Sequence, residues 1–265
     1  MEKPHRSIKY YLKYYWDKFF PRKFSVIANT IVSKKDKKDF LCKELKEGIS
    51  VLPTECLIQN LPAIRQQGSL SSCMSHAAIG AYEIQLTKRR FIEGSELFHY
   101  YNARKYVFKT FPSLTGMTIR DGCKTLLKWG YAFECLWGYN ASKVNVEPSA
   151  LAYSFSKLYK IDRYERLTNL DQIKVSLLQN IPVICGIFVN SSFGRLNQEN
   201  YVYDPMKREG GGHAVIIVGY NDAEQTFTIR NSWGKRFGNK GYFEMTYKSF
   251  KNTSFDWFRI IKKRW

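Results

Sequence analysis

Residues 211–234 read GGHAVIIVGYNDAEQTFTIRNSWG and predict a β-hairpin. The continuous apolar run Ala214–Tyr220 suits a buried strand, and Thr226–Arg230 alternates apolar and polar side chains as a second strand would. An Asn-Asp pair between the two runs is typical of a turn, so the two strands are expected to pair with each other. The hairpin therefore brings the start of its first strand close to the end of its second strand.

Two polar side chains stand at those two strand ends, His213 at the start of the first strand and Asn231 at the end of the second. Asn231 can accept a hydrogen bond from the imidazole N–H and so hold the ring in one orientation. Trp233 could shield that bond from water, and Gly212 permits a close approach beside the histidine. A lone histidine at such a place is usually a packing residue, so this interpretation depends on a second segment.

That second segment is QGSLSSC, residues 67–73, which stands directly ahead of a predicted helix. Cys73 would begin the helix, where the helix N-terminus favours a thiolate and the Cys73 N–H points toward a developing oxyanion. Gln67 could fold its side-chain amide back as a second oxyanion donor, and Ser71 and Ser72 offer capping hydroxyls. Taken alone, a cysteine in such a loop is structural more often than catalytic.

Together these segments resemble the papain family of cysteine peptidases, which includes the cathepsins. The family pattern is Gln-Gly-x-x-x-Ser-Cys, then Gly-His-Ala, then Asn-Ser-Trp-Gly-x-x-Trp-Gly-x-x-Gly-Tyr. The chain matches it with QGSLSSC (67–73), GGHAV (211–215) and NSWGKRFGNKGYF (231–243), and about 140 residues separate the cysteine from the histidine. The middle stretch, with ELFHYYNARKY (96–106) and TIRDGCKTLLKWGYAFECLWGY (118–139), resembles the bacterial and large-virus branch.

The resemblance implies an α+β fold of two lobes, a helical left lobe and an antiparallel β-barrel-like right lobe, with the active site in the cleft between them. It implies Cys73 as nucleophile, His213 as acid/base, Asn231 as the orienting residue, Gln67 in the oxyanion hole and Trp233 over the Asn–His bond. The expected activity is that of a thiol endopeptidase, which hydrolyses protein or peptide substrates through an acyl-enzyme. We expect no cofactor and no metal, since the cysteines form no CxxC pair.

The chain also departs from the family pattern at several positions. Leu70 stands where the family has a cysteine three residues before the nucleophile, so that disulfide is absent. Met74 replaces the aromatic residue after the nucleophile, Phe237 replaces the second tryptophan, and Gly212 replaces the Asp or Asn that often precedes the histidine. None of these changes removes a catalytic atom, but they bear on the shape of the cleft.

Two further readings of the site stay open at this point. One is a catalytically weak papain-fold protein that serves in binding or is packaged in a virion, which the high charge and the Met74 change suggest. The other is acyl transfer on the same cysteine, for example transamidation. The intact set of Cys73, His213, Asn231 and Gln67 argues against the first reading, and the sequence does not separate the second from hydrolysis.

The resemblance divides the chain at about residue 50. Residues 50–265 are expected to form the catalytic domain, with the helical lobe at about 70–165 and the β lobe at about 166–265. Residues 1–49 are a basic N-terminal extension and a candidate pro-segment.

Within this extension, apolar residues recur at helical spacing from Ile8 to Phe20, and Pro21 ends the expected amphipathic helix. A second helix is expected over Lys37–Glu47. An exposed apolar stripe would promote aggregation, so we expect it to pack on its own catalytic domain. In this family a segment ahead of the catalytic domain commonly covers the cleft until it is removed, and if the stripe also crosses the cleft, the chain is a zymogen. Burial in a partner, or peripheral contact of residues 8–20 with an anionic membrane surface, are the alternatives.

Helices are expected in the first part of the catalytic domain and strands in the last, which favours the α+β class. One helix is predicted over Ile119–Trp129, and Asn169 followed by Gln172 resembles a capping box ahead of another. Ile181–Val189 is a buried-strand candidate, and it is far shorter than the roughly 20 apolar residues that span a bilayer.

Charge and cysteine usage bear on the partners and the compartment. The net charge is +19, of which residues 1–50 carry +7, so the charge is spread and predicts non-specific contact with polyanions but no specific nucleic-acid recognition. The start of the chain has no secretory signal, so we expect an intracellular protein with reduced cysteines, in a virion or the host cytoplasm if it is viral. Cys123 and Cys185 are expected in the core.

Overall fold

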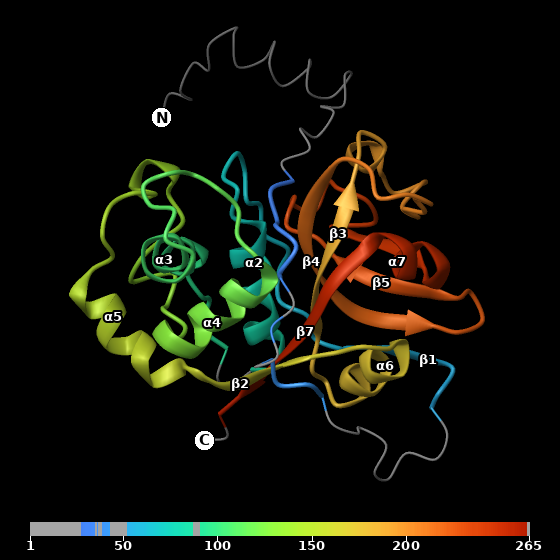
Figure 1. Ribbon diagram of the computed structural model, residues 1–265, viewed down its shortest axis with the longest axis horizontal. Helices are drawn as coiled ribbons and strands as arrows, with labels where there is room; N and C mark the ends of the chain where they lie inside the picture. The colour runs from blue at the N-terminus through green and yellow to red at the C-terminus, as the bar shows by residue number, and fades with distance from the viewer. Residues whose placement is uncertain (1–27, 35, 37–38, 43–51, 87–90, 264–265) are drawn as a thin grey trace, which may run out of the picture.

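The fold is described from a computed structural model (Figure 1). The structure describes residues 28–34, 36, 39–42, 52–86 and 91–263. The expected amphipathic helix at residues 8–20 lies outside these residues.

One half of the molecule is helical and gathers on one side of Figure 1. Its elements are α2 (Cys73–Ile84), α3 (Glu96–Asn102), the π-helix η2 (Ala103–Val107), α4 (Ile119–Trp129), the short η3 (Ala141–Lys143), α5 (Ala150–Ser156) and η4 (Lys157–Tyr159). The predicted helix start at Cys73 is confirmed, and α4 has the predicted bounds. The Thr118 side chain caps α4 by accepting a hydrogen bond from the Asp121 N–H.

The other half is an antiparallel sheet with α6 (Leu170–Leu178), η5 (Phe193–Arg195) and α7 (Tyr247–Thr253) beside it. Its strands are β1 (Glu55–Leu57), β2 (Ile161–Arg166), β3 (Val183–Val189), β4 (Gly211–Asn221), β5 (Thr226–Arg230), β6 (Tyr242–Thr246) and β7 (Ser254–Lys262). They follow the order β2-β7-β3-β4-β5-β6, and β1 pairs with β4. The α+β class and the predicted strands are therefore confirmed, as is the Asn169 cap of α6, which accepts from the Gln172 N–H at 2.8 Å.

Within the described residues the sheet does not close into a barrel, which differs from the barrel-like lobe that the sequence led us to expect. The reason lies in β7. Its first part pairs with β3, where Ser254 is opposite Ile187, and its last part pairs with β2, where Lys262 is opposite Ile161. The sheet thus extends from β7 toward the helical half and does not return to β6.

The predicted hairpin is confirmed as β4 and β5, whose register places Ile216 opposite Arg230 and Ile217 opposite Ile229. Continuing this register by one residue sets Asn231 opposite Val215. His213 is then the diagonal neighbour of Asn231 on the same face of the sheet, a separation across which long side chains can meet.

The strand β4 has no polar side chain from Ala214 to Val218 because both of its faces are buried there. Val215 and Ile217 belong to the core between the sheet and α6, and Ala214 and Ile216 belong to the core between the sheet and the helices α2 and α4. Helix α2 approaches β4 closely at Gly80, where a Cβ would lie 2.8 Å from the Ile216 side chain. This contact holds the middle of α2 against the middle of β4.

The two cysteines that were expected in the core lie there, because Cys123 and Cys185 are both fully buried among apolar side chains. Burial raises the thiol pKa of each of them. All six cysteines are free thiols.

The prediction of a second helix in the extension, over Lys37–Glu47, is wrong at those of its residues that the structure describes. Residues 39–42 are not helical, and Leu41 forms a β-bridge with Arg166 at the edge of the sheet. The backbone beside this bridge also forms a hydrogen bond with Arg166, because the Cys42 N–H donates to the Arg166 carbonyl at 3.0 Å. Tertiary pairing has here overridden a local helical pattern. In the part of the chain that the structure describes, no helix combines the length and the apolar character needed to cross a membrane.

Candidate active site

The predicted nucleophile and its partner histidine face each other across the junction of the two halves. Cys73 is the first residue of α2 and is 1% exposed, and His213 is the third residue of β4 and is fully buried. Burial raises the pKa of the Cys73 thiol, but the His213 ring, the Thr30 hydroxyl and the Ala214 N–H lower it, and the net direction is downward from the ordinary value of 9.0. The site therefore favours a thiolate.

The histidine ring is held by the amide predicted to orient it. His213 Nε2 lies 2.7 Å from Asn231 Oδ1, which also accepts from the Ser232 N–H at 2.8 Å. Because Oδ1 accepts, Nε2 carries the proton, and Nδ1 is left as the ring nitrogen available to the thiol. Among the described residues Nδ1 has no hydrogen-bond partner. The Trp233 ring lies over this pair, with its centroid 5.0 Å from that of His213.

Gln67 is buried and fixed at both ends of its side chain. Its Oε1 accepts from the Ser232 hydroxyl at 2.7 Å, and its Nε2 donates to the Leu70 carbonyl at 3.0 Å. These contacts decide which end of the amide is the donor. One Nε2 hydrogen goes to Leu70, and the second is free to serve as the predicted oxyanion donor.

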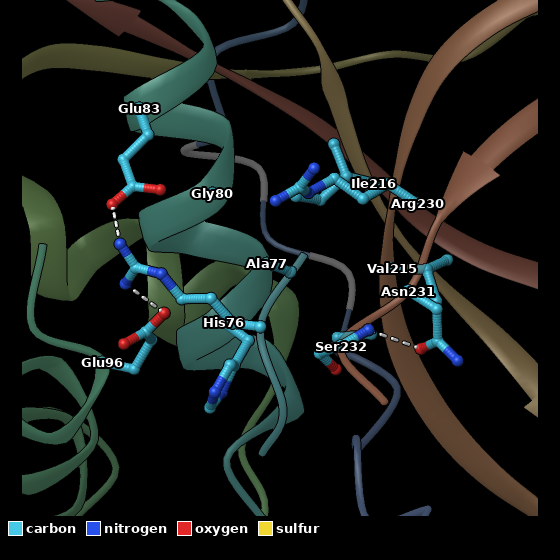
Figure 2. Close-up of a pocket in the computed structure, with 12 residues that line it drawn as sticks. His76, Ala77, Gly80, Glu83, Glu96, Val215, Ile216, Arg230, Asn231 and Ser232 are labelled. Atoms are coloured by element: carbon cyan, nitrogen blue, oxygen red, sulfur yellow. Dashed lines mark hydrogen bonds and ion pairs between the residues drawn. The ribbon is translucent and has the colours of Figure 1, made fainter. Parts of the chain in front are cut away.

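The segment that leads to Gln67 is tied to the helical half by buried charges. The Arg65 guanidinium lies 2.5 Å from Glu83 on α2 and 2.5 Å from Glu96 on α3. Figure 2 shows these carboxylates on one side of a pocket and Asn231 and Ser232 on the other. The ion pairs and the hairpin thus hold the two sides of the site at a fixed separation.

A stretch of the N-terminal extension, residues 28–34, runs through the site, and we call it the strap. It is the blue segment that passes between the helices and the sheet in Figure 1. Thr30 Oγ1 lies 3.0 Å from Cys73 Sγ, and the Thr30 N–H donates to the Gly212 carbonyl at 2.6 Å. On the helical side, Asn29 donates to the Ser71 hydroxyl at 2.6 Å. The strap therefore lies directly over the predicted nucleophile.

Three glycines leave room for the backbone of the strap. A Cβ on Gly116 would lie 1.7 Å from the Asn29 carbonyl oxygen, and a Cβ on Gly211 would lie 2.4 Å from that of Ala28. A Cβ on Gly212 would lie 2.0 Å from the carbonyl oxygen of Thr30. The absence of the Asp or Asn side chain at position 212 is thus what lets the strap lie against β4.

Past the strap, the chain is anchored by a buried ionic cluster, which consists of Asp39, Arg120, Arg166 and Asp256. Both carboxylate oxygens of Asp39 accept from Arg120, at 2.6 and 2.5 Å. Arg166 bridges Asp39 and Asp256, at 3.3 and 3.0 Å. The second oxygen of Asp256 accepts from the Ser33 N–H at 2.5 Å. This cluster fixes the strap at its C-terminal end.

The structure thus brings Cys73, His213, Asn231, Trp233 and Gln67 to one junction, with Gly212 under the strap. No local pattern marks Thr30 or Ser232 as contacts of the site. They lie 43 and 165 residues from their partners Cys73 and Gln67. Among the described residues, no three His, Cys, Asp or Glu side chains gather as a metal site would require.

The comparisons with known proteins agree with this fold. The family model that matches describes papain family cysteine proteases and covers residues 128–256. The solved structure of xylellain, a cysteine protease from Xylella fastidiosa, superposes with a TM-score of 0.79 at 30% identity, over 89% of this chain and 96% of xylellain. The chain belongs to the papain family of cysteine proteases.

Among curated proteins, an uncharacterized peptidase C1-like protein of Acanthamoeba polyphaga mimivirus is 36% identical over 198 residues, which cover 69% of this chain and 63% of that protein. Cathepsin Q of Rattus norvegicus is 27% identical over 207 residues, which cover 69% of this chain and 54% of cathepsin Q. The chain therefore spans less than two thirds of the length of these curated relatives. The resemblance to viral and bacterial members agrees with the branch that its middle stretch indicated.

Proposed function

We propose that the protein is a cysteine-type peptidase that hydrolyses peptide bonds through a thioester on Cys73. The observation that carries the proposal is the buried pair of Cys73 and His213, with the thiol pKa lowered and the imidazole held by Asn231 at 2.7 Å. A thiolate attacks the carbonyl carbon of the scissile peptide, and the protonated His213 gives a proton to the leaving amine. Water then attacks the thioester and releases the acid, with His213 acting as general base.

The negative charge that develops on the substrate oxygen needs donors that are already in place. The Cys73 N–H at the start of α2 and the free hydrogen of Gln67 Nε2 are the two candidates, and Ser232 keeps the latter amide turned the right way. The family implies protein or peptide substrates.

The test is hydrolysis of a set of peptide substrates by the full-length Gly211→Ala chain, in which the strap must move and which is the wild-type reference here, and by the same chain with Cys73→Ala. Loss of hydrolysis in Cys73→Ala, with an unchanged circular dichroism spectrum, supports the proposal. Hydrolysis at the wild-type rate would overturn it. An added amine acceptor that diverts the acyl group into an amide would show acyl transfer instead, and blocked internal peptides compared with free-ended ones separate endopeptidase from exopeptidase activity.

We further propose that the chain with its strap in place is a zymogen, because the strap occupies the place that a substrate must take. Thr30 contacts Cys73 Sγ at 3.0 Å, and the thiol is left 1% exposed. The Gly212 carbonyl that would be available to a substrate backbone already accepts from the Thr30 N–H. Release of the strap is then the activating step.

Two glycine variants of the full-length chain test this proposal. Gly211→Ala places a methyl group where the Ala28 carbonyl now lies, so the strap must move, whereas Gly138→Ala meets nothing closer than 3.6 Å. We expect faster alkylation of Cys73 and higher peptidase activity in Gly211→Ala only. Equal rates in wild type and Gly211→Ala, with Gly211→Ala folded and its strap displaced by hydrogen exchange, would refute the zymogen while leaving the peptidase proposal standing.

A further inference from the structure

The loop that carries the oxyanion donors, residues 67–73, has no covalent cross-link in this chain. Leu70 is buried in an apolar setting, and all six cysteines are free. A loop that must place donors to within a fraction of an ångström needs some other restraint, because small misplacements of such groups cost rate.

The side chain of Tyr139 supplies a candidate restraint. Its hydroxyl lies 2.8 Å from the Gln67 carbonyl and 2.7 Å from the Ser72 hydroxyl. A phenol has one proton to give, and a carbonyl can only accept, so Tyr139 donates to Gln67 and accepts from Ser72. One hydroxyl thus joins the first residue of the loop to the residue before Cys73.

The residue before Cys73 does not cap α2 in the ordinary way. Ser72 is the N-cap residue, and a serine there ordinarily has extended backbone and accepts a hydrogen bond from the N–H of the second or third helical residue. Here it makes no capping bond, contrary to what the sequence predicted, and its backbone lies outside the extended region, with φ −101° and ψ 16°. Its hydroxyl donates to Tyr139, so this contact holds the residue that leads directly into Cys73.

Tyr139 is itself held in one position. Its backbone N–H donates to Glu134 Oε1 at 2.6 Å, and its ring meets His76 edge to face with centroids 5.0 Å apart. His76 in turn contacts the Ser72 carbonyl at 3.1 Å. Burial raises the pKa of the Tyr139 phenol although its bond with Ser72 lowers it, so the hydroxyl keeps its proton at neutral pH.

We propose that Tyr139 is a positioning residue for the oxyanion hole, whose hydroxyl fixes both ends of the 67–73 loop. The proposal rests on the peptidase function proposed above. Tyr139 touches no reacting atom and acts through Gln67 and through the Cys73 N–H.

The experiment is Tyr139→Phe in the full-length Gly211→Ala chain, whose displaced strap leaves the site open and which serves as the wild-type reference, with Tyr153→Phe in the same chain as the matched control. Tyr153 lies in the same half and loses one side-chain hydrogen bond, to Asn102 at 3.1 Å. We expect Tyr139→Phe to lower kcat about tenfold with KM unchanged, as loss of one well-placed hydrogen bond does. The control should keep wild-type kinetics.

Two inhibitors distinguish misplaced oxyanion donors from a general disturbance of the active site. A peptide aldehyde forms a tetrahedral adduct whose oxygen needs the oxyanion donors, whereas iodoacetamide alkylates the thiolate without them. We expect Tyr139→Phe to weaken aldehyde binding about tenfold and to leave Cys73 alkylation unchanged. Added to Gln67→Ala, it should have little further effect on either kcat or aldehyde binding, because both changes act on one donor set.

Wild-type kcat and aldehyde affinity in Tyr139→Phe would overturn the inference, and so would an equal fall in alkylation. Hydrogen exchange of the 67–73 peptide gives a readout that does not depend on activity. Faster exchange there in Tyr139→Phe, but not in Tyr153→Phe, is expected. If no variant, the Gly211→Ala reference with its displaced strap included, hydrolyses peptides or binds the aldehyde, the peptidase proposal fails, and unchanged exchange would then reject the role of Tyr139 as well.

Discussion

Cys73 sits in an environment in which two opposing effects act on one thiol. Burial disfavours the thiolate, as it does for Cys56, whose pKa is raised by burial alone. At Cys73 the neighbouring His213, Thr30 and Ala214 N–H overcome this effect and lower the pKa. Reactivity at mildly acidic pH should therefore be concentrated at one cysteine of the six.

We expect iodoacetamide at pH 6 to label Cys73 well ahead of Cys56 once the strap is displaced, as in Gly211→Ala. The sign follows from the pKa shifts, since a lowered pKa keeps the thiolate present as pH falls and a raised pKa removes it. Labelling is measured by peptide mapping between pH 5 and 9. Equal labelling of both cysteines across that range would contradict the shift.

The residues around Cys73 should differ in how much each contributes to turnover. Gln67→Ala removes one preorganised donor and is expected to lower kcat roughly 10²-fold with little change in KM. Asn231→Ala should cost less than His213→Ala, because it frees the ring that Asn231 holds at 2.7 Å but leaves the base in place. Steady-state kinetics on one peptide substrate compares the three variants, and unaltered turnover in Gln67→Ala would place the oxyanion elsewhere.

At this scale the sequence predicted the residues that lie in motifs and missed those that reach the site from far along the chain. Gln67, Cys73, His213 and Asn231 stand in short segments whose chemistry is readable. Thr30, Ser232 and Tyr139 contribute through contacts with partners 43, 165 and 67 residues away, and no local pattern marks them.

At the scale of elements, the local sequence predicted a helix correctly wherever adjacent residues form the hydrogen bonds at its ends. The bounds of α4 and the Asn169 cap of α6 follow from neighbouring residues alone. The predictions failed where a distant partner takes over. Ser72 does not cap α2 and instead donates its hydroxyl to Tyr139, and residues 39–42 form no helix because they pair with the edge of β2. The open sheet likewise depends on pairing between remote strands.

Two truncations should separate the effect of the strap on activity from the effect of the buried ionic cluster on stability. Removing residues 1–34 takes away the strap and keeps Asp39, so we expect higher activity and little loss of stability. Removing residues 1–42 also takes Asp39 from the buried Arg120, whose side chain is 8% exposed, and should destabilise the fold by about 3 kcal/mol. Activity assays and thermal unfolding of both forms check this.

The full-length variant Asp39→Ala serves as the control for the longer truncation. It should show a similar loss of stability while residues 1–38 are still present. If the two truncated forms were equally stable, the ionic cluster would not be what fixes this part of the chain.

For the whole molecule, the two cores are less independent than the layout of a helical and a sheet half implies. One core lies between the sheet and α6, the other between the sheet and the helices α2 and α4, and β4 contributes side chains to both. The charges of Arg65, Glu83 and Glu96 lie buried near the same junction. If either half lost its packing, one face of β4 would be exposed while the other face still belonged to the core of the remaining half.

The strand β7 links the two halves, so we expect them to unfold cooperatively. It is paired over its first residues with β3 and over its last with β2, so melting one half alone would have to break a single continuous strand in its middle. We therefore expect one endotherm in scanning calorimetry, with the calorimetric and van 't Hoff enthalpies equal, although a chain of this size with two halves would ordinarily be allowed two. Two resolved peaks would mean that β7 frays at the point where its partners change, and that the halves are folding units in their own right.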